Sequence, residues 1–210
     1  MTTDHDSTNP VPTDAPAAAA APDGPTRPRA VLVSGPPGSG KSTVGRLVAG
    51  RLGAALLDLD TATASLTAVI GRLHGTDDLD DPEVVRLTRA ARYEAVTALA
   101  EDNLAAGTGV VLVAPFSAER RDPASWATLE SRLVGAGAAA SLVWLRISPA
   151  EVLRRVGQRG AARDAGKRRG DWLAGLDLSP PLVPHLVVDA HLAPPVVAER
   201  ILASLRPRDR

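Results

Sequence analysis

The clearest chemical signature is a short glycine-rich stretch, VSGPPGSGKST, at positions 33–43. Its spacing, G-x-x-x-x-G-K-S from residue 35 to residue 42, is that of a phosphate-binding loop. Glycine lets successive backbone N–H groups approach a phosphate closely, whereas the two prolines have no N–H to donate. The expected nucleotide-binding residues are therefore Gly35, which opens the loop, and the donors Gly38, Ser39, Gly40, Lys41, Ser42 and Thr43.

Lys41 and Ser42 give this loop a specific chemistry. We expect the Lys41 ammonium to reach the β and γ phosphates and the Ser42 hydroxyl to bind Mg²⁺, while the helix that begins at Lys41 adds its positive end. The alternative is a Gly-Pro turn that happens to precede a helix. Because the motif follows an apolar run and opens a helical pattern, the sequence favours binding of ATP with Mg²⁺.

Two carboxylates follow the next apolar run, in the sequence LLDLD at positions 56–60. If residues 54–60 form a strand, Asp58 and Asp60 lie on the same side of its carboxyl end, where ligands bind in open α/β sheets. One carboxylate can orient the waters of Mg²⁺ and the other can accept the proton of an attacking hydroxyl. The alternative is that one or both cap a helix over 61–73, because Asp is a good N-cap.

A basic, glycine-containing stretch over 154–170 is a second candidate for catalysis. Arg155, Arg159 and Arg163 recur at every fourth residue, so they share one face if the segment is helical. Such a segment suits a closing lid, in which Arg159 and Arg163 stabilise charge on the transferring γ-phosphoryl group and Arg155 binds the nucleotide. The alternative is a solvated basic face paired with nearby acids.

Four further residues are weaker candidates for an acceptor pocket. Arg89 and Tyr93 lie one turn apart in a long helical pattern, and Arg120 and Arg121 follow the third apolar run. On amphipathic helices such residues are more often surface or boundary positions. They stay open as candidates for contact with an acceptor.

An α/β framework is needed to bring these residues together, and the hydrophobic pattern predicts one. Short apolar runs suited to buried strands occupy 30–34, 54–60, 109–115, 141–147 and 185–189. Helical patterns occupy 41–51, 61–73, 82–106, 118–134, 149–159 and 195–205. The alternation predicts a parallel sheet with helices on both faces, a three-layer α/β/α domain, whereas periodicity leaves the strand order open.

Length and composition limit the classes of partner. The 210 residues carry equal numbers of acidic and basic side chains, so the chain has no bulk attraction for nucleic acid or anionic membranes, and aromatics, at 2%, are few for a single-strand channel. The chain has no cysteine and no apolar run of membrane-spanning length, which fits a cytoplasmic protein. We expect a disordered leader over 1–29 and one domain over 30–206, as a monomer or homodimer.

Together, the glycine-rich loop, the Asp-x-Asp pair, the VVLVAPF run and the Arg-x-x-x-Arg-Asp-x-x-Lys pattern resemble the small P-loop kinases of the nucleoside monophosphate kinase-like group. The similarity covers about residues 30–205. It is closest to bacterial AAA-family proteins predicted to be ATP-binding kinases, with gluconate, zeta-toxin and shikimate kinases as wider relatives.

The resemblance implies ATP and Mg²⁺, a five-stranded sheet of order 2-3-1-4-5 and an arginine-rich lid over about 154–170. It also implies that Asp60 is the base and that Asp58 helps to hold the metal. Two features depart from the family. Val113 stands where many members carry an acid in strand three, and APFSAERR replaces the Gly-Gly-Gly turn of shikimate kinases.

Three functional hypotheses follow, and they differ in the group that receives the phosphoryl. The leading one is a phosphotransferase acting on a hydroxyl of a small-molecule acceptor, with Lys41, Asp60, Arg159 and Arg163 as catalytic residues. The second is a kinase for a nucleotide or for the 5′-hydroxyl of a polynucleotide. The third is an ATP-driven switch that hydrolyses ATP without an acceptor.

Overall fold

The computed structural model describes residues 27–159 and 175–205. Its strands are β1 (Arg29–Ser34), β2 (Ala55–Asp58), β3 (Val110–Val113), β4 (Ala139–Arg146) and β5 (Leu186–Asp189). Its helices are α1 (Lys41–Leu52), α2 (Leu59–Leu73), α3 (Pro82–Ala105), α4 (Pro123–Gly135), α5 (Pro149–Arg159) and α7 (Pro194–Leu205). The predicted leader, as far as residue 26, and the predicted lid from residue 160 to 170 lie outside the described residues.

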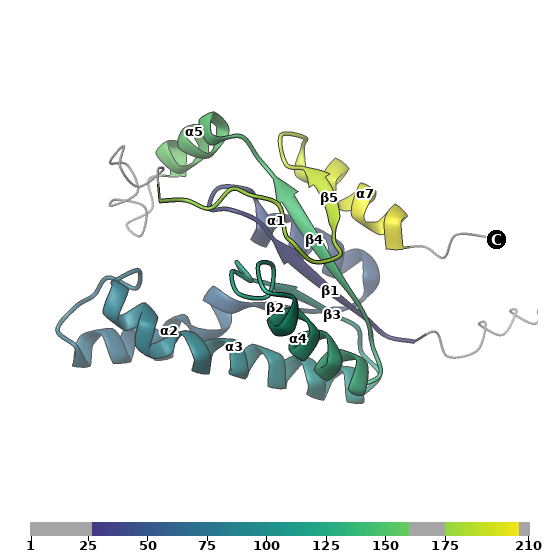
Figure 1. Ribbon diagram of the computed structural model, residues 1–210, viewed down its shortest axis with the longest axis horizontal. Helices are drawn as coiled ribbons and strands as arrows, with labels where there is room; N and C mark the ends of the chain where they lie inside the picture. The colour runs from purple at the N-terminus through teal and green to yellow at the C-terminus, as the bar shows by residue number, and fades with distance from the viewer. Residues whose placement is uncertain (1–26, 160–174, 206–210) are drawn as a thin grey trace, which may run out of the picture.

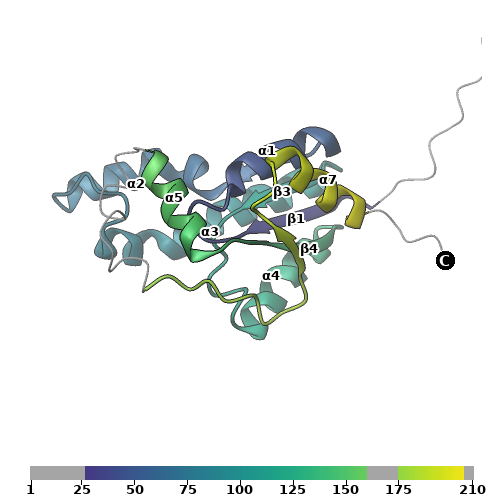
Figure 2. The ribbon, with the colours of Figure 1, turned by 90° about the horizontal axis from the view of Figure 1, so that it is seen from above.

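The five strands form one parallel sheet in the order β2-β3-β1-β4-β5. This order confirms the predicted fold class. Parallel neighbours require crossover connections, and the helices that make them cover both faces of the sheet. Figure 2 shows α1 and α7 on one side and α4 on the other, and α3 packs in the same apolar cluster as α4.

The central strand β1 supplies both faces of the core. Val31 and Val33 pack in the cluster that contains residues of α1 and α7, whereas Ala30 and Leu32 pack in the cluster of α3 and α4. All four are fully buried, and burying one valine or leucine side chain stabilises a fold by about 1.5–3 kcal/mol. The strand begins at Arg29, so the folded part starts inside the predicted leader.

The strand predicted over 54–60 ends at Asp58, because this residue begins α2. Asp58 is the N-cap of α2, and its Oδ1 accepts the N–H groups of Asp60 at 3.1 Å and Thr61 at 3.2 Å. Asp60 therefore lies in the first turn of a helix. The prediction that both carboxylates lie on one side of a strand end is wrong, and the helix-cap alternative holds for Asp58.

Helix α4 begins at Pro123 and not, as predicted, at residue 118. Asp122 caps it by accepting the N–H groups of Ala124 and Ser125. Residues 118–121 form a turn, in which the N–H of Arg120 donates to the carbonyl of Phe116 at 2.9 Å. The Asp-Pro pair is an N-cap followed by a preferred first helical residue, which accounts for the later start.

The carboxyl ends of the strands meet at one end of the domain, where α2 and α5 lie on either side (Figure 1). The phosphate-binding loop leaves β1 at this same end. The topology thus places this loop at the same end of the sheet as the residues that follow β2, as expected for an open α/β sheet. Within the described ranges, no helix is both long and apolar enough to cross a membrane.

Candidate active site

The phosphate-binding loop joins β1 to α1 through two left-handed glycines. Gly38 has φ 76° and Gly40 has φ 88°, values that residues with a Cβ rarely adopt. Gly40 is also the N-cap of α1, and it provides no side-chain cap. The first N–H groups of α1 are thus left for an anion, and the helix dipole favours one there.

Pro36 organises the loop through its carbonyl oxygen. Lys41 Nζ donates to this oxygen at 3.0 Å and the Ser39 N–H donates to it at 3.2 Å. The Ser39 side chain is buried, and its hydroxyl has no hydrogen-bond partner among the described residues. A Cβ on Gly35 would lie 2.7 Å from that hydroxyl. The Ser39 side chain therefore packs inside the loop, so a contact of this residue with a nucleotide has to use its backbone.

Ser42 and Asp58, the predicted magnesium ligands, both line the same cavity. Both cap bonds of Asp58 use Oδ1, so the cap does not require Oδ2. The described residues contain no group of three or more His, Cys, Asp or Glu side chains placed to hold a metal ion. Mg²⁺ is commonly held by one or two carboxylates together with phosphate oxygens and water. One hydroxyl and one carboxylate oxygen beside a triphosphate site fit that mode of binding.

Val113 occupies the end of β3, the position at which the resemblance implies an acid in many family members. It pairs in register with Asp58 and lines the cavity. Gly45 of α1 packs directly on it, since a Cβ on Gly45 would lie 2.4 Å from Val113 Cγ2. At this position the chain has an apolar contact between helix and sheet instead of a second metal ligand.

Asp60 is held by an arginine that the sequence analysis did not single out. Arg92 of α3 donates from Nη2 to Asp60 Oδ1 at 2.7 Å and from Nε to Thr63 Oγ1 at 2.8 Å. The Arg92 side chain is 17% exposed and that of Asp60 is 64% exposed. Arg92 lies three residues after Arg89 and next to Tyr93. The helical spacing that made Arg89 and Tyr93 candidates could therefore also have identified Arg92.

Tyr93 and the loop after β3 build a rigid wall of the site. The Tyr93 hydroxyl accepts the Phe116 N–H at 3.0 Å, and the two rings meet edge to face with centroids 6.0 Å apart. Phe116 has φ 45°, a left-handed conformation that is rare for a bulky residue. Burial is the main cause that raises the pKa of Tyr93 to about 12, so the phenol is neutral near pH 7.

A cavity of about 780 Å³ joins these groups, a volume in the range of small-molecule sites. Its phosphate end is lined by Gly35, Gly38, Gly40, Lys41 and Ser42. Its acceptor end, as we call the part along α2, α3 and the loop after β3, is lined by Asp60, Thr67, Asp80, Arg89, Arg92, Tyr93 and Arg120. Of the predicted nucleotide-binding residues, Ser39, Thr43 and Arg155 do not line it.

Arg120 and Arg121 form a clamp on Asp177. Arg120 lines the cavity, but it is 5% exposed, donates to Asp177 Oδ2 at 2.7 Å and lies with its guanidinium carbon 4.9 Å from the centre of the Trp144 ring. Arg121 donates twice to the Asp177 carboxylate, each time at 2.6 Å, and does not line the cavity. The bond from Arg121 is the main cause that holds the pKa of Asp177 below its usual range. Both arginines thus fasten the chain around Asp177 to the β3–α4 loop.

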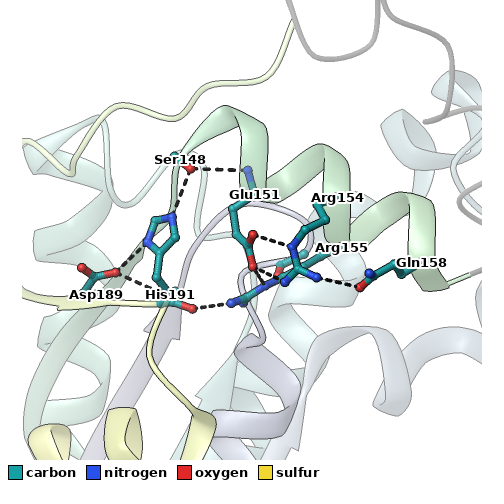
Figure 3. Close-up of polar contacts among 9 residues, drawn as sticks. Ser148, Glu151, Arg154, Arg155, Gln158, Asp189 and His191 are labelled. Carbon is teal, nitrogen blue, oxygen red and sulfur yellow. Dashed lines mark hydrogen bonds and ion pairs between the residues drawn. The ribbon is translucent and has the colours of Figure 1, made fainter.

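Arg155 fastens α5 to the phosphate-binding loop (Figure 3). Its guanidinium donates to Glu151 Oε1 at 2.6 Å, to the Ala190 carbonyl at 2.8 Å and to the Gly38 carbonyl at 3.4 Å. Glu151 also accepts from Arg154, and this bond is the main cause that lowers the pKa of Glu151 to about 2. Arg155 is engaged with protein groups, so its predicted contact with a nucleotide requires these bonds to open.

Figure 3 also shows Ser148, His191 and Asp189 in the order of a hydrolase triad. His191 Nε2 lies 3.0 Å from Ser148 Oγ, and its Nδ1 lies 2.7 Å from Asp189 Oδ1. However, Ser148 Oγ accepts the Glu151 N–H at the start of α5, and none of the three side chains lines the cavity. We interpret the group as a link between the β4–α5 and β5–α7 loops.

The remaining predicted catalytic arginines belong to the predicted lid. Arg159 is the last residue of α5, and Arg163 lies outside the described residues. Their role at the transition state stays a prediction.

A family model described as an AAA domain matches residues 31–173. No curated protein matches the chain. Similar solved structures include proteins that are described as kinases. A protein from Chloroflexus aurantiacus is 21% identical with TM-score 0.63, over 86% of this chain and all of its own. The Mycobacterium tuberculosis APS kinase is 23% identical with TM-score 0.58, over 86% and 99%. A Sinorhizobium meliloti gluconokinase is 21% identical with TM-score 0.55, over 85% and 91%.

Proposed function

Because the chain belongs to the AAA domain family and has a P-loop kinase fold, we propose that it transfers the γ-phosphoryl group of ATP to a hydroxyl of a small-molecule acceptor. One observation carries the proposal: a continuous cavity is lined at one end by Lys41 and Ser42 and at the other by Asp60 and Tyr93. An ATPase switch needs only the phosphate end. A gluconokinase and an APS kinase share the fold, and both are named for small-molecule acceptors.

At the phosphate end, the backbone supplies most of the binding. The uncapped N–H groups at the start of α1 donate to phosphate oxygens, and Lys41 exchanges its bond to the Pro36 carbonyl for the β and γ phosphates. Ser42 and Asp58 would hold Mg²⁺, and the bound ion would neutralise charge on the phosphate oxygens. These contacts orient the γ phosphorus toward the acceptor end.

At the acceptor end, Asp60 acts as the general base. An acceptor hydroxyl gives its proton to the Asp60 carboxylate while its oxygen forms a bond to the γ phosphorus. The bond between the γ phosphorus and the β–γ bridging oxygen breaks, and ADP keeps that oxygen and its electron pair. Arg92 donates to Asp60 Oδ1, and this bond orients the carboxylate. Much of the rate enhancement comes from alignment and from charge stabilisation.

The experiment incubates the protein with Mg-ATP and a pool of hydroxylated metabolites, with 5′-hydroxyl oligonucleotides in a separate arm. Mass spectrometry then detects products that have gained one phosphoryl group, and ADP is measured in parallel. We expect a phosphorylated small molecule in an amount that matches the ADP formed. The Asp60→Asn protein is the matched control and should lose this product. ADP formation without any phosphorylated product, at an equal rate in the Asp60→Asn protein, would overturn the proposal in favour of an ATPase.

A further inference from the structure

The acceptor end of the cavity is rich in arginine, but its arginines differ in their partners. Arg92 is bonded to Asp60 and Thr63, and Arg120 is bonded to Asp177. Arg89 lines the same cavity from α3, one turn before Tyr93. Among the described residues, no ion pair or hydrogen bond joins the Arg89 guanidinium to Asp80 or to any other carboxylate. Arg89 is therefore the arginine at this end that no carboxylate of the described residues binds directly.

The Arg89 side chain is held in place by an aromatic ring instead. Its guanidinium carbon lies 4.9 Å from the centre of the Tyr93 ring, a distance typical of a cation–π contact. That ring is itself fixed by the bond from the Phe116 N–H to the Tyr93 hydroxyl. Because Tyr93 is buried and its pKa is raised to about 12, the phenol stays neutral and does not neutralise Arg89. The site thus presents a positioned guanidinium to the cavity.

An unpaired guanidinium at the wall of a binding cavity is best satisfied by an anionic ligand group. The planar fork of arginine matches a carboxylate or a phosphate and donates two parallel hydrogen bonds to it. On α3, Arg92 makes the contact with Asp60. Arg89 lies about one turn nearer the start of the same helix. An acceptor whose hydroxyl is at Asp60 would therefore extend along α3 to reach Arg89.

From this geometry we propose that the acceptor carries a carboxylate or phosphate group that binds Arg89, so the substrate class is a small hydroxyl compound that is already an anion. The proposal rests on the proposed kinase function, since it assumes that the acceptor occupies this end of the cavity. It makes Arg89 a specificity-determining residue, while Asp60 acts on the hydroxyl itself.

The test measures binding with matched probes in the presence of Mg-ADP, by ligand titration followed by NMR. Gluconate is compared with sorbitol and glycerol 3-phosphate with glycerol, so each pair differs in one anionic group and the two pairs separate carboxylate from phosphate. The variant is Arg89→Met, which keeps an unbranched stem against Tyr93. The control is Arg86→Met, one turn earlier on the same helix, where the exposed arginine is bonded to Glu83 and does not line the cavity.

We expect at least one anionic probe to bind the parent protein about 10- to 100-fold more tightly than its neutral partner, the range for hydrogen bonds to charged groups. Arg89→Met should remove this preference and leave affinity for the neutral probe and for Mg-ADP within about 2-fold, whereas Arg86→Met should keep the preference.

Equal binding of both members of each pair, no binding of either anion, or a preference that survives in Arg89→Met overturns the proposal. A preference that depends on Arg89 without any phosphoryl transfer would overturn the proposed function alone. Transfer to neutral acceptors only would overturn this inference alone.

Discussion

The two ends of the cavity are built in different ways. The phosphate end comes from one short segment, residues 35–42, and its binding groups are mostly backbone N–H groups set by left-handed glycines. The acceptor end comes from α2, α3 and the loop after β3, and its binding groups are side chains held by one another. Under the proposed function, the nucleotide would thus be bound by groups that lie close together in the chain, whereas the acceptor would be bound by side chains that only tertiary contacts bring together.

The arginines show the same division. Arg92 forms an ion pair with Asp60, and Arg155 forms one with Glu151. Arg120 and Arg121 both pair with Asp177. Each joins segments or fixes a carboxylate, so these residues set the shape of the site. Single substitutions can separate the roles of the two ends, and a change at Lys41 should affect both.

Lys41→Ala should have the largest effect, because it removes a full charge at the phosphate end. Loss of one preorganised donor costs about 10²- to 10³-fold in kcat, so we expect transfer and ATP hydrolysis to fall by at least this factor and ATP to bind more weakly. Calorimetry with ATP and a coupled ADP assay measure both. Arg51→Met on the same helix, where Arg51 pairs with Glu199 on the surface, is the control. Unchanged ATP affinity and turnover would show that the loop is not the phosphate site.

Asp60→Asn should damage only the acceptor end. The amide keeps the shape but cannot take the proton, so transfer should fall by about 10²- to 10⁴-fold. ATP affinity should change by less than about 2-fold, because the proposed phosphate contacts come from the loop and the start of α1. Single-turnover transfer measured beside ATP binding separates the two quantities. Parallel losses of binding and transfer would contradict the assignment of Asp60 as base.

Asp58→Asn should act through the metal. Asparagine is as good an N-cap as aspartate, so α2 should keep its start and the melting temperature should hardly change. The Mg²⁺ concentration for half-maximal activity should rise by about 10-fold, with transfer and background hydrolysis affected alike. Activity measured across a Mg²⁺ series tests this. A defect identical to that of Asp60→Asn would refute the division of roles between the two carboxylates.

Arg92→Met should lower kcat for transfer by about 10-fold and leave the KM for ATP unchanged, because Arg92 positions Asp60 and does not contact ATP. Arg92→Lys should restore only part of the rate, since a lysine cannot bond Thr63 and Asp60 in the same fork geometry. The double variant with Asp60→Asn should be no slower than Asp60→Asn alone. Additive losses in that cycle would show that Arg92 acts independently of Asp60.

Asp177→Asn should have the smallest effect, and on stability instead of chemistry. It leaves the buried Arg120 with a weaker partner, so the free energy of unfolding should fall by about 1 kcal/mol at pH 7. The folded-state pKa of Asp177 is lowered, so its contribution is complete above the ordinary pKa of about 3.9 and is lost as pH falls toward the lower folded value. Urea unfolding at pH 7 and pH 3 should show the difference shrinking in acid. An equal difference in unfolding free energy at both pH values would mean that the charge of Asp177 does not contribute to stability.

Much of the framework followed from local pattern. The apolar runs predicted all five strands, and the Gly-Lys-Ser spacing placed the start of α1 at Lys41, because both signals lie within a few neighbouring residues. The errors occurred where two local signals competed. At Asp58 the helix cap ended the strand before Asp60, and at Asp122 an Asp-Pro pair delayed α4 to Pro123. In both places an N-cap ended the apolar or helical pattern that periodicity alone had extended.

The sequence by itself determined the phosphate-binding loop, the parallel α/β class and the pair of carboxylates after β2, since each depends on residues adjacent in the chain. Only the tertiary structure decided that Asp60 meets Arg92, which lies 32 positions away, and that Tyr93 binds the backbone of Phe116. It also decided that Arg92 and Arg120 pair with carboxylates at the cavity, whereas Arg89 lines it from a place on the Tyr93 ring. The physical reason is that charge balance and side-chain burial depend on which helix faces pack together, and periodicity gives the face of a helix without naming the residues that oppose it.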